Sequence, residues 1–204
     1  APERLPEIIN QPGITSTQPN VIQDGDKELL YFASNRVGGQ GGMDIWYTSR
    51  DLTEAGFSFD PPRNAGAKIN TAKNELTPFF DVKESVLYFS SDGHLGMGGL
   101  DIFKIKGNRS IWETPDNLGA PFNSGSDDYF YIENRYGDGG FFVSNRKNEP
   151  QKTVSTDEDI FEFKVTNKPQ AFVLKGTVYD EASQNPIQAV EISIYEMVSD
   201  QQAN

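Results

Sequence analysis

Short runs of apolar residues alternate along the chain with polar turns rich in Gly, Pro, Asn and Asp. The runs at residues 76–82 (LTPFFDV) and 86–91 (VLYFSS) contain many aromatic and β-branched side chains, and residues 101–106 (DIFKIK) follow an alternating pattern. These compositions favour strands over helices, and no segment keeps a helical period of 3.6 residues. The sequence therefore predicts an all-β fold.

One block of aromatic, serine and glycine residues occurs three times. The block at residues 30–46 contains LYFASNR, a Gly-Gly pair and DIW, and it recurs without a gap as residues 87–103. A third copy covers residues 141–161, with five extra residues in the loop at 147–158. An insertion at this point indicates a surface loop.

The residues between these blocks repeat as well. Phe59, Pro62, Asn64, Gly66, Ile69 and Asn70 have counterparts in Trp112, Pro115, Asn117, Gly119, Phe122 and Asn123. One repeat therefore holds four short strands, which is the arrangement of a β-propeller blade, whereas sandwiches do not repeat their sequence every four strands. We expect about three four-stranded blades within residues 1–165.

Three blades predict an incomplete propeller, because propellers normally close with about 4 to 8 blades. Such a structure would have two open blade faces. We therefore expect the chain to belong to a longer polypeptide or to receive its missing blades from elsewhere.

The pattern changes after residue 165. Residues 166–171 (TNKPQA) have the composition of a linker. Residues 172–204 predict two alternating strands around a turn at residues 183–186, which would be the truncated start of a β-sandwich. Two strands alone are only marginally stable.

The repeated signature resembles the TolB-type, WD-like propeller repeat. Its residues here are Ser34-Asn35-Arg36, Gly41-Gly42 and Asp44-Ile45-Trp46, with their copies. Gly176-Thr177-Val178-Tyr179-Asp180 and Asn185-Pro186-Ile187 resemble the start of a carboxypeptidase-regulatory-like domain. This order is similar to that of modular OmpA-family envelope proteins of Bacteroidetes, which include components associated with type IX secretion and gliding.

The resemblance implies a periplasmic or outer-membrane-associated protein. Its partners would be other envelope proteins, and peptidoglycan would be bound only through domains outside this chain.

Composition excludes several classes of partner. The 204 residues carry a net charge of −12, so nucleic acid and anionic membrane surfaces would be repelled. No apolar run reaches the roughly 18 residues that cross a bilayer, and residues 1–10 lack the layout of a signal peptide. The absence of Cys excludes disulfides, a thiolate nucleophile and cysteine-based metal sites.

Three aspartates share one position in the repeat, directly after the Gly-rich loop: Asp44, Asp101 and Asp159. A carboxylate that opens a strand can accept hydrogen bonds from the N–H groups of the turn, so we expect a structural role. Arg36 and Arg146 are candidates to bind these carboxylates within their own repeats. The structural signature as a whole comprises Ser34, Asp44, Trp46, Ser91, Asp101, Phe103, Ser144, Asp159 and Phe161.

Acidic residues precede the first strand of two repeats and are candidates for a binding site. Glu75, Asp127 and Asp128 could face a propeller channel and bind a cation or a basic peptide, or they could form a solvated acidic rim. His94 is the only histidine, and we expect it in an exposed loop. No catalytic triad, nucleophile elbow, metal site or cofactor is predicted. The Gly/Asp loops could also bind calcium.

Aromatic side chains offer a further candidate surface. Tyr47, Trp112, Tyr129 and Tyr131 could form a sugar-binding or protein-binding patch. We expect most aromatic residues of the blades to fill the core between them instead.

These observations predict a non-catalytic protein-interaction or scaffold module of a cell-envelope protein, in a type IX secretion or gliding setting. The alternative is an accessory or glycan-binding propeller of a secreted hydrolase. The sequence that follows Asn204 would separate the two, because an OmpA-like domain fits the first and a hydrolase domain fits the second.

Overall fold

A computed structural model describes residues 1–53, 58–147, 157–165, 179–181 and 183–186. The chain divides into two units, residues 1–166 and 167–204. The described part of the first unit contains twelve strands in three antiparallel sheets and no helix, which confirms the predicted all-β class.

The first sheet has the order β1-β2-β3-β4. Its strands are β1 (Ser16–Asp24), β2 (Lys27–Ser34), β3 (Asp44–Asp51) and the short β4 (Arg63–Asn64). Neighbours along the chain pair with each other, so the sheet is a meander in which β2 pairs with β3 over its full length.

The second sheet repeats this plan with β5 (Glu75–Asp81), β6 (Val86–Ser91) and β7 (Asp101–Asn108). The short strands β8 (Ile111–Trp112) and β9 (Asp116–Asn117) both pair with β7. The third sheet consists of β10 (Asp128–Glu133), β11 (Gly139–Ser144) and β12 (Asp159–Lys164).

The three sheets share one register. The serine that ends the second strand lies opposite the repeated aspartate in each sheet, as Ser34↔Asp44, Ser91↔Asp101 and Ser144↔Asp159. The first strand of each sheet also contains a β-bulge with one non-glycine residue at positive φ: Gln18 (53°), Thr77 (51°) and Phe130 (59°). The repeat in the sequence is therefore a repeat of structure.

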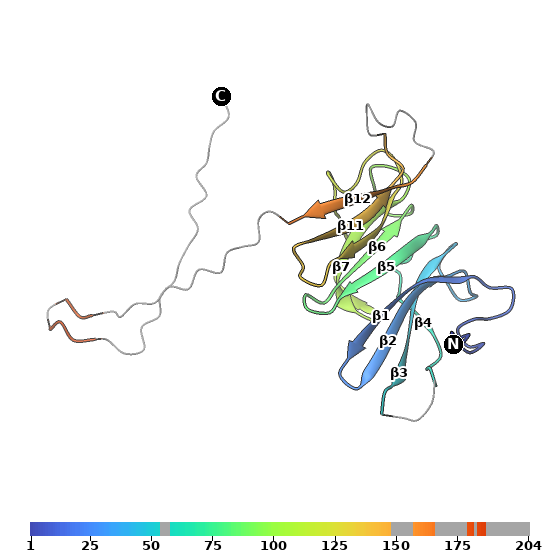
Figure 1. The fold of residues 1–204 in the computed structure, drawn as a ribbon, viewed down its shortest axis with the longest axis horizontal. Helices are drawn as coiled ribbons and strands as arrows, with labels where there is room; N and C mark the ends of the chain where they lie inside the picture. The colour runs from blue at the N-terminus through green and yellow to red at the C-terminus, as the bar shows by residue number, and fades with distance from the viewer. Residues whose placement is uncertain (54–57, 148–156, 166–178, 182, 187–204) are drawn as a thin grey trace. The chain divides into compact units, whose positions relative to one another are not determined.

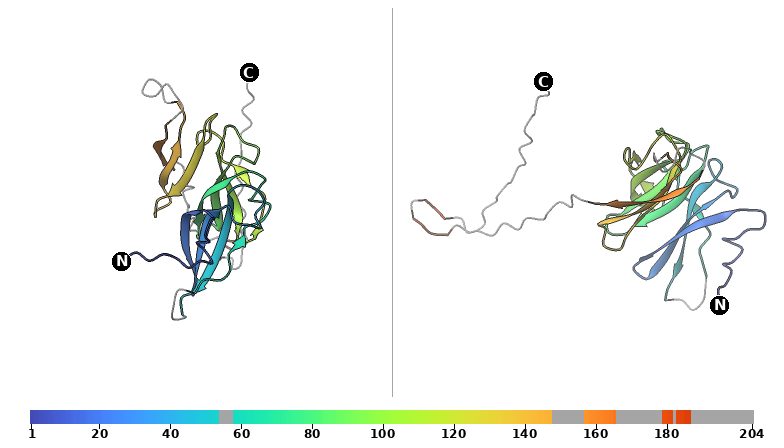
Figure 2. Two further views of the ribbon diagram at one scale, coloured as in Figure 1. Left: turned by 90° about the vertical axis from the view of Figure 1, so that its right-hand side faces the viewer. Right: turned by 45° about the horizontal axis from the view of Figure 1, so that its top comes forward.

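The sheet of β5–β9 lies between the other two, and the two further views keep this order (Figures 1 and 2). One apolar cluster joins the first sheet to the second and includes Tyr31, Ile45, Phe89 and Trp112. Another joins the second to the third and includes Ile102, Tyr131 and Phe142. Burial between the sheets, rather than within any one sheet, supplies the core.

In each of the two loops that connect successive sheets, a buried asparagine binds the sheet before the loop. Asn70 accepts a hydrogen bond from the backbone N–H of Ile45 (2.8 Å) and donates one to its carbonyl (2.9 Å). Asn123 makes the same pair of bonds to Ile102, at 2.8 Å each. The repeated Asn thus provides an acceptor for the isoleucine N–H and a second donor for its carbonyl, which also accepts from the N–H of Ala65 or Leu118.

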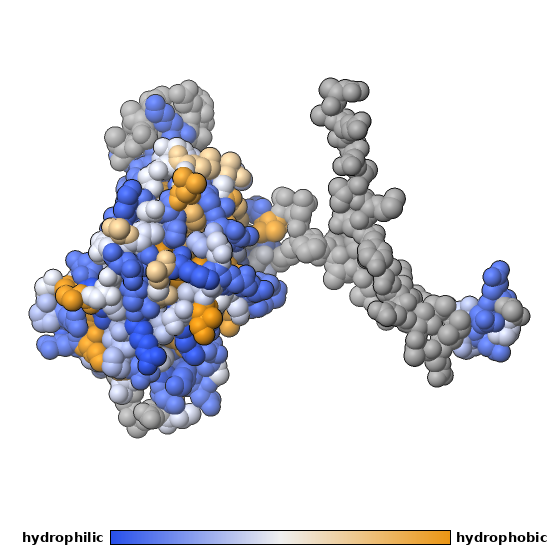
Figure 3. All heavy atoms as spheres, turned by 180° about the vertical axis from the view of Figure 1, so that it is seen from behind, coloured by the Kyte–Doolittle hydropathy of each residue, from blue (hydrophilic) through white to orange (hydrophobic). Residues whose placement is uncertain are grey.

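The surface opposite to the view of Figure 1 is mainly hydrophilic, with apolar residues in separate patches (Figure 3). This distribution is ordinary for a folded chain of high net charge.

The predicted strand segments of the middle repeat agree with β5 to β8. In the second unit the described residues form an antiparallel bridge between Tyr179 and Pro186, which fits the predicted turn at residues 183–186. The predicted linker and the remainder of the two predicted strands lie outside the described residues.

Candidate functional site

Two of the three repeated aspartates, Asp44 and Asp101, close turns, whereas Asp159 is exposed. Asp44 accepts hydrogen bonds from the backbone N–H groups of Gln40 and Gly41, and Asp101 accepts them from Met97 (2.7 Å) and Gly98 (3.1 Å). Both carboxylates are buried. This is the contact that the sequence predicts for them, and each lies in a different sheet, so they do not form one site.

Replacing Asp101 with alanine should lower the free energy of unfolding by about 1–3 kcal/mol, because the N–H groups of Met97 and Gly98 lose their buried acceptor. Chemical denaturation of the whole chain measures this loss. Substituting the exposed Asp26 by alanine provides the control and should change stability by less than about 0.5 kcal/mol. Equal stability of the two variants would contradict the turn-closing role.

Arg36 does not bind Asp44, contrary to the prediction. Its guanidinium donates to the carbonyl of Ile9 (2.7 Å) and to the Ser34 and Ser16 hydroxyls, and it lies over the rings of Phe32 and Trp46. The contact therefore fixes the segment before β1 to the first sheet. The sequence pattern gave no sign of this because the acceptors are backbone carbonyls.

Arg146 has the corresponding role in the third sheet. It donates to the Phe122 carbonyl and the Ser144 hydroxyl, and its guanidinium forms an ion pair with Asp128. The prediction paired it with Asp159 instead. The ion pair forms because Ser144 and Asp128 face each other across β10 and β11, directly beside Arg146.

His94 takes this role in the middle sheet, so the expectation of an exposed loop residue is wrong. Its ring is half-buried, packs against Phe89 and Phe103, and places Nε2 2.8 Å from the Ile69 carbonyl. Gly93 stands where Arg36 stands in the first sheet, and a Cβ there would lie 1.8 Å from the Thr71 hydroxyl. In the middle sheet, His94, the residue after Gly93, therefore makes the contact that an arginine makes in the other two sheets.

The acidic candidates Glu75 and Asp128 do not lie on a solvated rim, because both are fully buried. Glu75 accepts hydrogen bonds from Thr71 and Ser91, and burial raises the pKa of its carboxyl above the ordinary value. Asp128 accepts from Ser124 and pairs with Arg146.

Asp127 is half-buried and accepts hydrogen bonds from the backbone of Leu100 (2.9 Å) and the side chain of Asn145 (2.9 Å). The three predicted site acids are therefore engaged within the fold and are not brought together on an exposed surface.

The aromatic candidates do not form an exposed patch. Tyr47, Trp112 and Tyr131 are buried and Tyr129 is half-buried. Trp112 donates its indole N–H to the carbonyls of Ala65 and Arg109, at 2.9 Å each. These side chains contribute mainly to the core.

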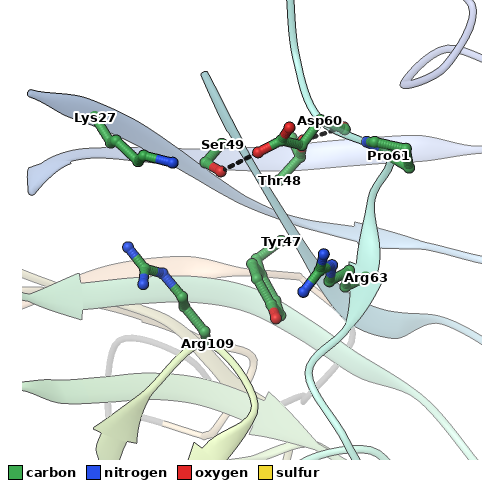
Figure 4. Close-up of a pocket in the computed structure, with 8 residues that line it drawn as sticks. All are labelled: Lys27, Tyr47, Thr48, Ser49, Asp60, Pro61, Arg63 and Arg109. Atoms are coloured by element: carbon green, nitrogen blue, oxygen red, sulfur yellow. Dashed lines mark hydrogen bonds between the residues drawn. The ribbon is translucent and has the colours of Figure 1, made fainter. Parts of the chain in front are cut away.

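A polar cavity of about 270 Å³ lies beside β3 and β4 (Figure 4). It is lined by Lys27, Tyr47, Thr48, Ser49, Asp60, Pro61, Arg63 and Arg109. Figure 4 shows Lys27 and Arg109 on one side of the cavity and Tyr47 beside Arg63. Three cations and one acid therefore meet on a chain whose net charge is −12.

The third sheet exposes an apolar face, which we call the open face. It consists of Phe130, Ile132, Phe141 and Ile160. Ile160 is 77% exposed, whereas Ile45 and Ile102, which occupy the same register position in the other two sheets, are fully buried. Those isoleucines are covered by the next sheet, and Ile160 is not.

Within the described ranges, no group of three His, Asp or Glu side chains could hold a metal ion. The same part of the chain has no helix long and apolar enough to span a bilayer.

Comparisons give no external guide. No protein-family model matches this chain, and no curated protein or solved structure is significantly similar to it.

Proposed function

We propose that the three sheets are successive blades of a β-propeller-type module and that this module is a non-catalytic scaffold that binds other proteins. The common register and the common bulge support the blade assignment. The side chains of Arg36, His94 and Arg146 support it as well, because each binds an equivalent backbone carbonyl in the segment before its own sheet. The three sheets hold four, five and three described strands, and repetition of a short antiparallel meander is typical of propellers.

The open face carries the binding proposal. Phe79, Tyr88 and Ile102 of the second sheet pack against Tyr131 and Phe142 of the third. Ile132, Phe141 and Ile160 of the open face occupy the same positions in the third sheet as Phe79, Tyr88 and Ile102 do in the second, and no described sheet packs against them. A partner that fits it is therefore another antiparallel sheet with aromatic side chains at the positions of Tyr131 and Phe142.

The polar side chains support a structural rather than a catalytic use of the repeat. His94, Glu75, Asp101 and Asp128 are each hydrogen-bonded to other groups within the fold. A general acid or base has to reach a substrate, and groups held in this way do not.

The cell-envelope setting is part of the same proposal. It rests on the order of the propeller-like repeat and the regulatory-like segment, which resembles that of OmpA-family envelope proteins. Other envelope proteins are then the partners, in a type IX secretion or gliding context. Peptidoglycan would be bound only by domains outside this chain.

A photo-crosslinking residue at position 160 tests this function. In the envelope fraction of the cells that produce the protein, we expect a discrete protein adduct that maps to an aromatic strand of the partner. Position 111 on β8 is the control, because Ile111 is equally apolar and 82% exposed but lies outside the open face. The additional substitution Phe141→Glu should abolish the adduct.

Absence of an adduct at position 160, or the same adducts from both positions, would overturn the proposal. An adduct that maps only to a second copy of this chain would overturn the scaffold role as well. Specific adducts with glycan in place of protein would favour the accessory module of a hydrolase.

A further inference from the structure

We propose that the cavity between Lys27, Arg63 and Arg109 is a binding site for an oxyanion, a carboxylate or phosphate group. The site lies between the first sheet and the turn after β7, and it is independent of the open face. It therefore adds a second binding activity to the proposed scaffold.

Several hydrogen-bond donors around the cavity are unused. Within the part of the chain that the structure describes, neither the Lys27 ammonium nor the Arg63 guanidinium has a hydrogen bond or an ion pair. The Tyr47 ring is buried, but its hydroxyl is accessible and has no hydrogen-bond partner there. It is therefore a further donor available to a ligand.

The acceptors near the cavity are already engaged. Asp60 accepts from the Ser49 hydroxyl at 2.7 Å, and Asp24 pairs with Arg109 at 2.9 Å. Asp51, which lies opposite Lys27 across β2 and β3, accepts from Thr53, and these bonds hold the pKa of its carboxyl below the ordinary value. Lys27 also attracts the Asp51 carboxylate, but neither Lys27 nor Arg63 donates a hydrogen bond within the described residues, and an anion would supply acceptors for these donors.

The same place in the second sheet has a different composition. Tyr47 pairs with Arg63 across β3 and β4, and the corresponding pair across β7 and β9 is Lys104 with Asp116. The cavity of about 210 Å³ there is lined by Lys104 and Lys106 and by Glu113 and Asp116. Its charges balance, so the blade fold does not require the cationic lining of the first sheet.

Two guanidinium groups suit a carboxylate or a phosphate, because each presents its N–H groups as a planar fork. The cavity of about 270 Å³ is slightly smaller than the roughly 300–1,000 Å³ of most small-molecule sites. It therefore has room for one anionic group and its immediate neighbours. Since the lining cations are partly exposed, binding should weaken as salt concentration rises.

Titration of the whole chain with inorganic phosphate and with succinate, at constant ionic strength and followed by amide chemical shifts, tests the site. We expect saturable shifts at residues around Ser49 and Arg109. Arg63→Gln should weaken binding about tenfold, the loss expected for one charge-assisted hydrogen bond. Tyr47→Phe should weaken it about fivefold without lowering the melting temperature, because the hydroxyl has no partner in the fold.

Lys104→Gln is the matched control, since it removes one positive charge at the corresponding place in the second sheet. It should leave both affinities unchanged. Tighter binding of phosphate or of succinate identifies the preferred anion, and either result supports the site. Shifts that do not saturate, or equal weakening by Arg63→Gln and Lys104→Gln, would overturn it.

Discussion

Replacing Trp112 with alanine is expected to lower the free energy of unfolding by about 3–5 kcal/mol. The indole is buried, packs against Tyr31 and Phe80, and donates its N–H to the Ala65 and Arg109 carbonyls. Truncation removes apolar contact between the first and second sheets and leaves buried carbonyls with one donor fewer.

Urea denaturation followed by far-UV circular dichroism measures this loss. Ile111→Ala is the control, because that side chain is adjacent but 82% exposed, and it should cost less than about 0.5 kcal/mol. Trp112→Phe should have an intermediate cost, since the ring keeps part of the packing but loses the donor. If the alanine variants at 111 and 112 were equally stable, the packing between the first two sheets would not depend on Trp112.

Asp128→Ala is expected to lower the free energy of unfolding by about 3 kcal/mol, at the lower end of the range for breaking a buried ion pair. Asp128 is fully buried, and the Arg146 side chain is 19% exposed. Removing the carboxylate leaves the guanidinium without its counter-charge and both donors of Ser124 without an acceptor. The connection between the second and third sheets should loosen first, because Arg146 also holds the Phe122 carbonyl.

Hydrogen exchange of amides in β10 and β11 locates this effect, and denaturation measures its size. Asp128→Asn keeps an acceptor and should cost less than the alanine variant. Glu84→Ala removes an exposed acid in a surface turn and should be neutral. A cost for Asp128→Ala no larger than that for Glu84→Ala would show that the ion pair does not stabilise the third sheet.

The strands and their order could be predicted from the sequence because their causes are local. Aromatic and β-branched residues between Gly, Pro and Asn turns favour extended backbone, and the same order recurs in each repeat. The turn-closing role of Asp44 and Asp101 also follows from local spacing, since donor and acceptor are three or four residues apart.

The roles of Arg36, His94 and Arg146 could not be predicted in this way. Each binds a backbone carbonyl about 25 residues away, and a carbonyl has no signature in the sequence. Comparison of the repeats position by position gave only the substitution of Gly93 for arginine. His94 makes the contact of the missing arginine only because the loop places the imidazole ring beside the Ile69 carbonyl.

The cavity of the first sheet was missed for a similar reason. Its cations come from β2, β4 and the turn after β7, which are far apart in the chain. The available signal was a difference in charge between two equivalent residue pairs. Tyr47 and Arg63 carry one positive charge in the first repeat, whereas Lys104 and Asp116 carry opposite charges in the second. That contrast has meaning only once the register of the strands is known.

The sequence by itself determined that this protein is a repeat of short antiparallel strands, because alternation, turn residues and spacing are properties of neighbouring residues. The tertiary structure decided which of the equivalent side chains are buried. Ile45, Ile102 and Ile160 have the same local surroundings, yet two are fully buried and one is 77% exposed. The difference arises because burial requires a second sheet on the face, and no local pattern records whether one is there.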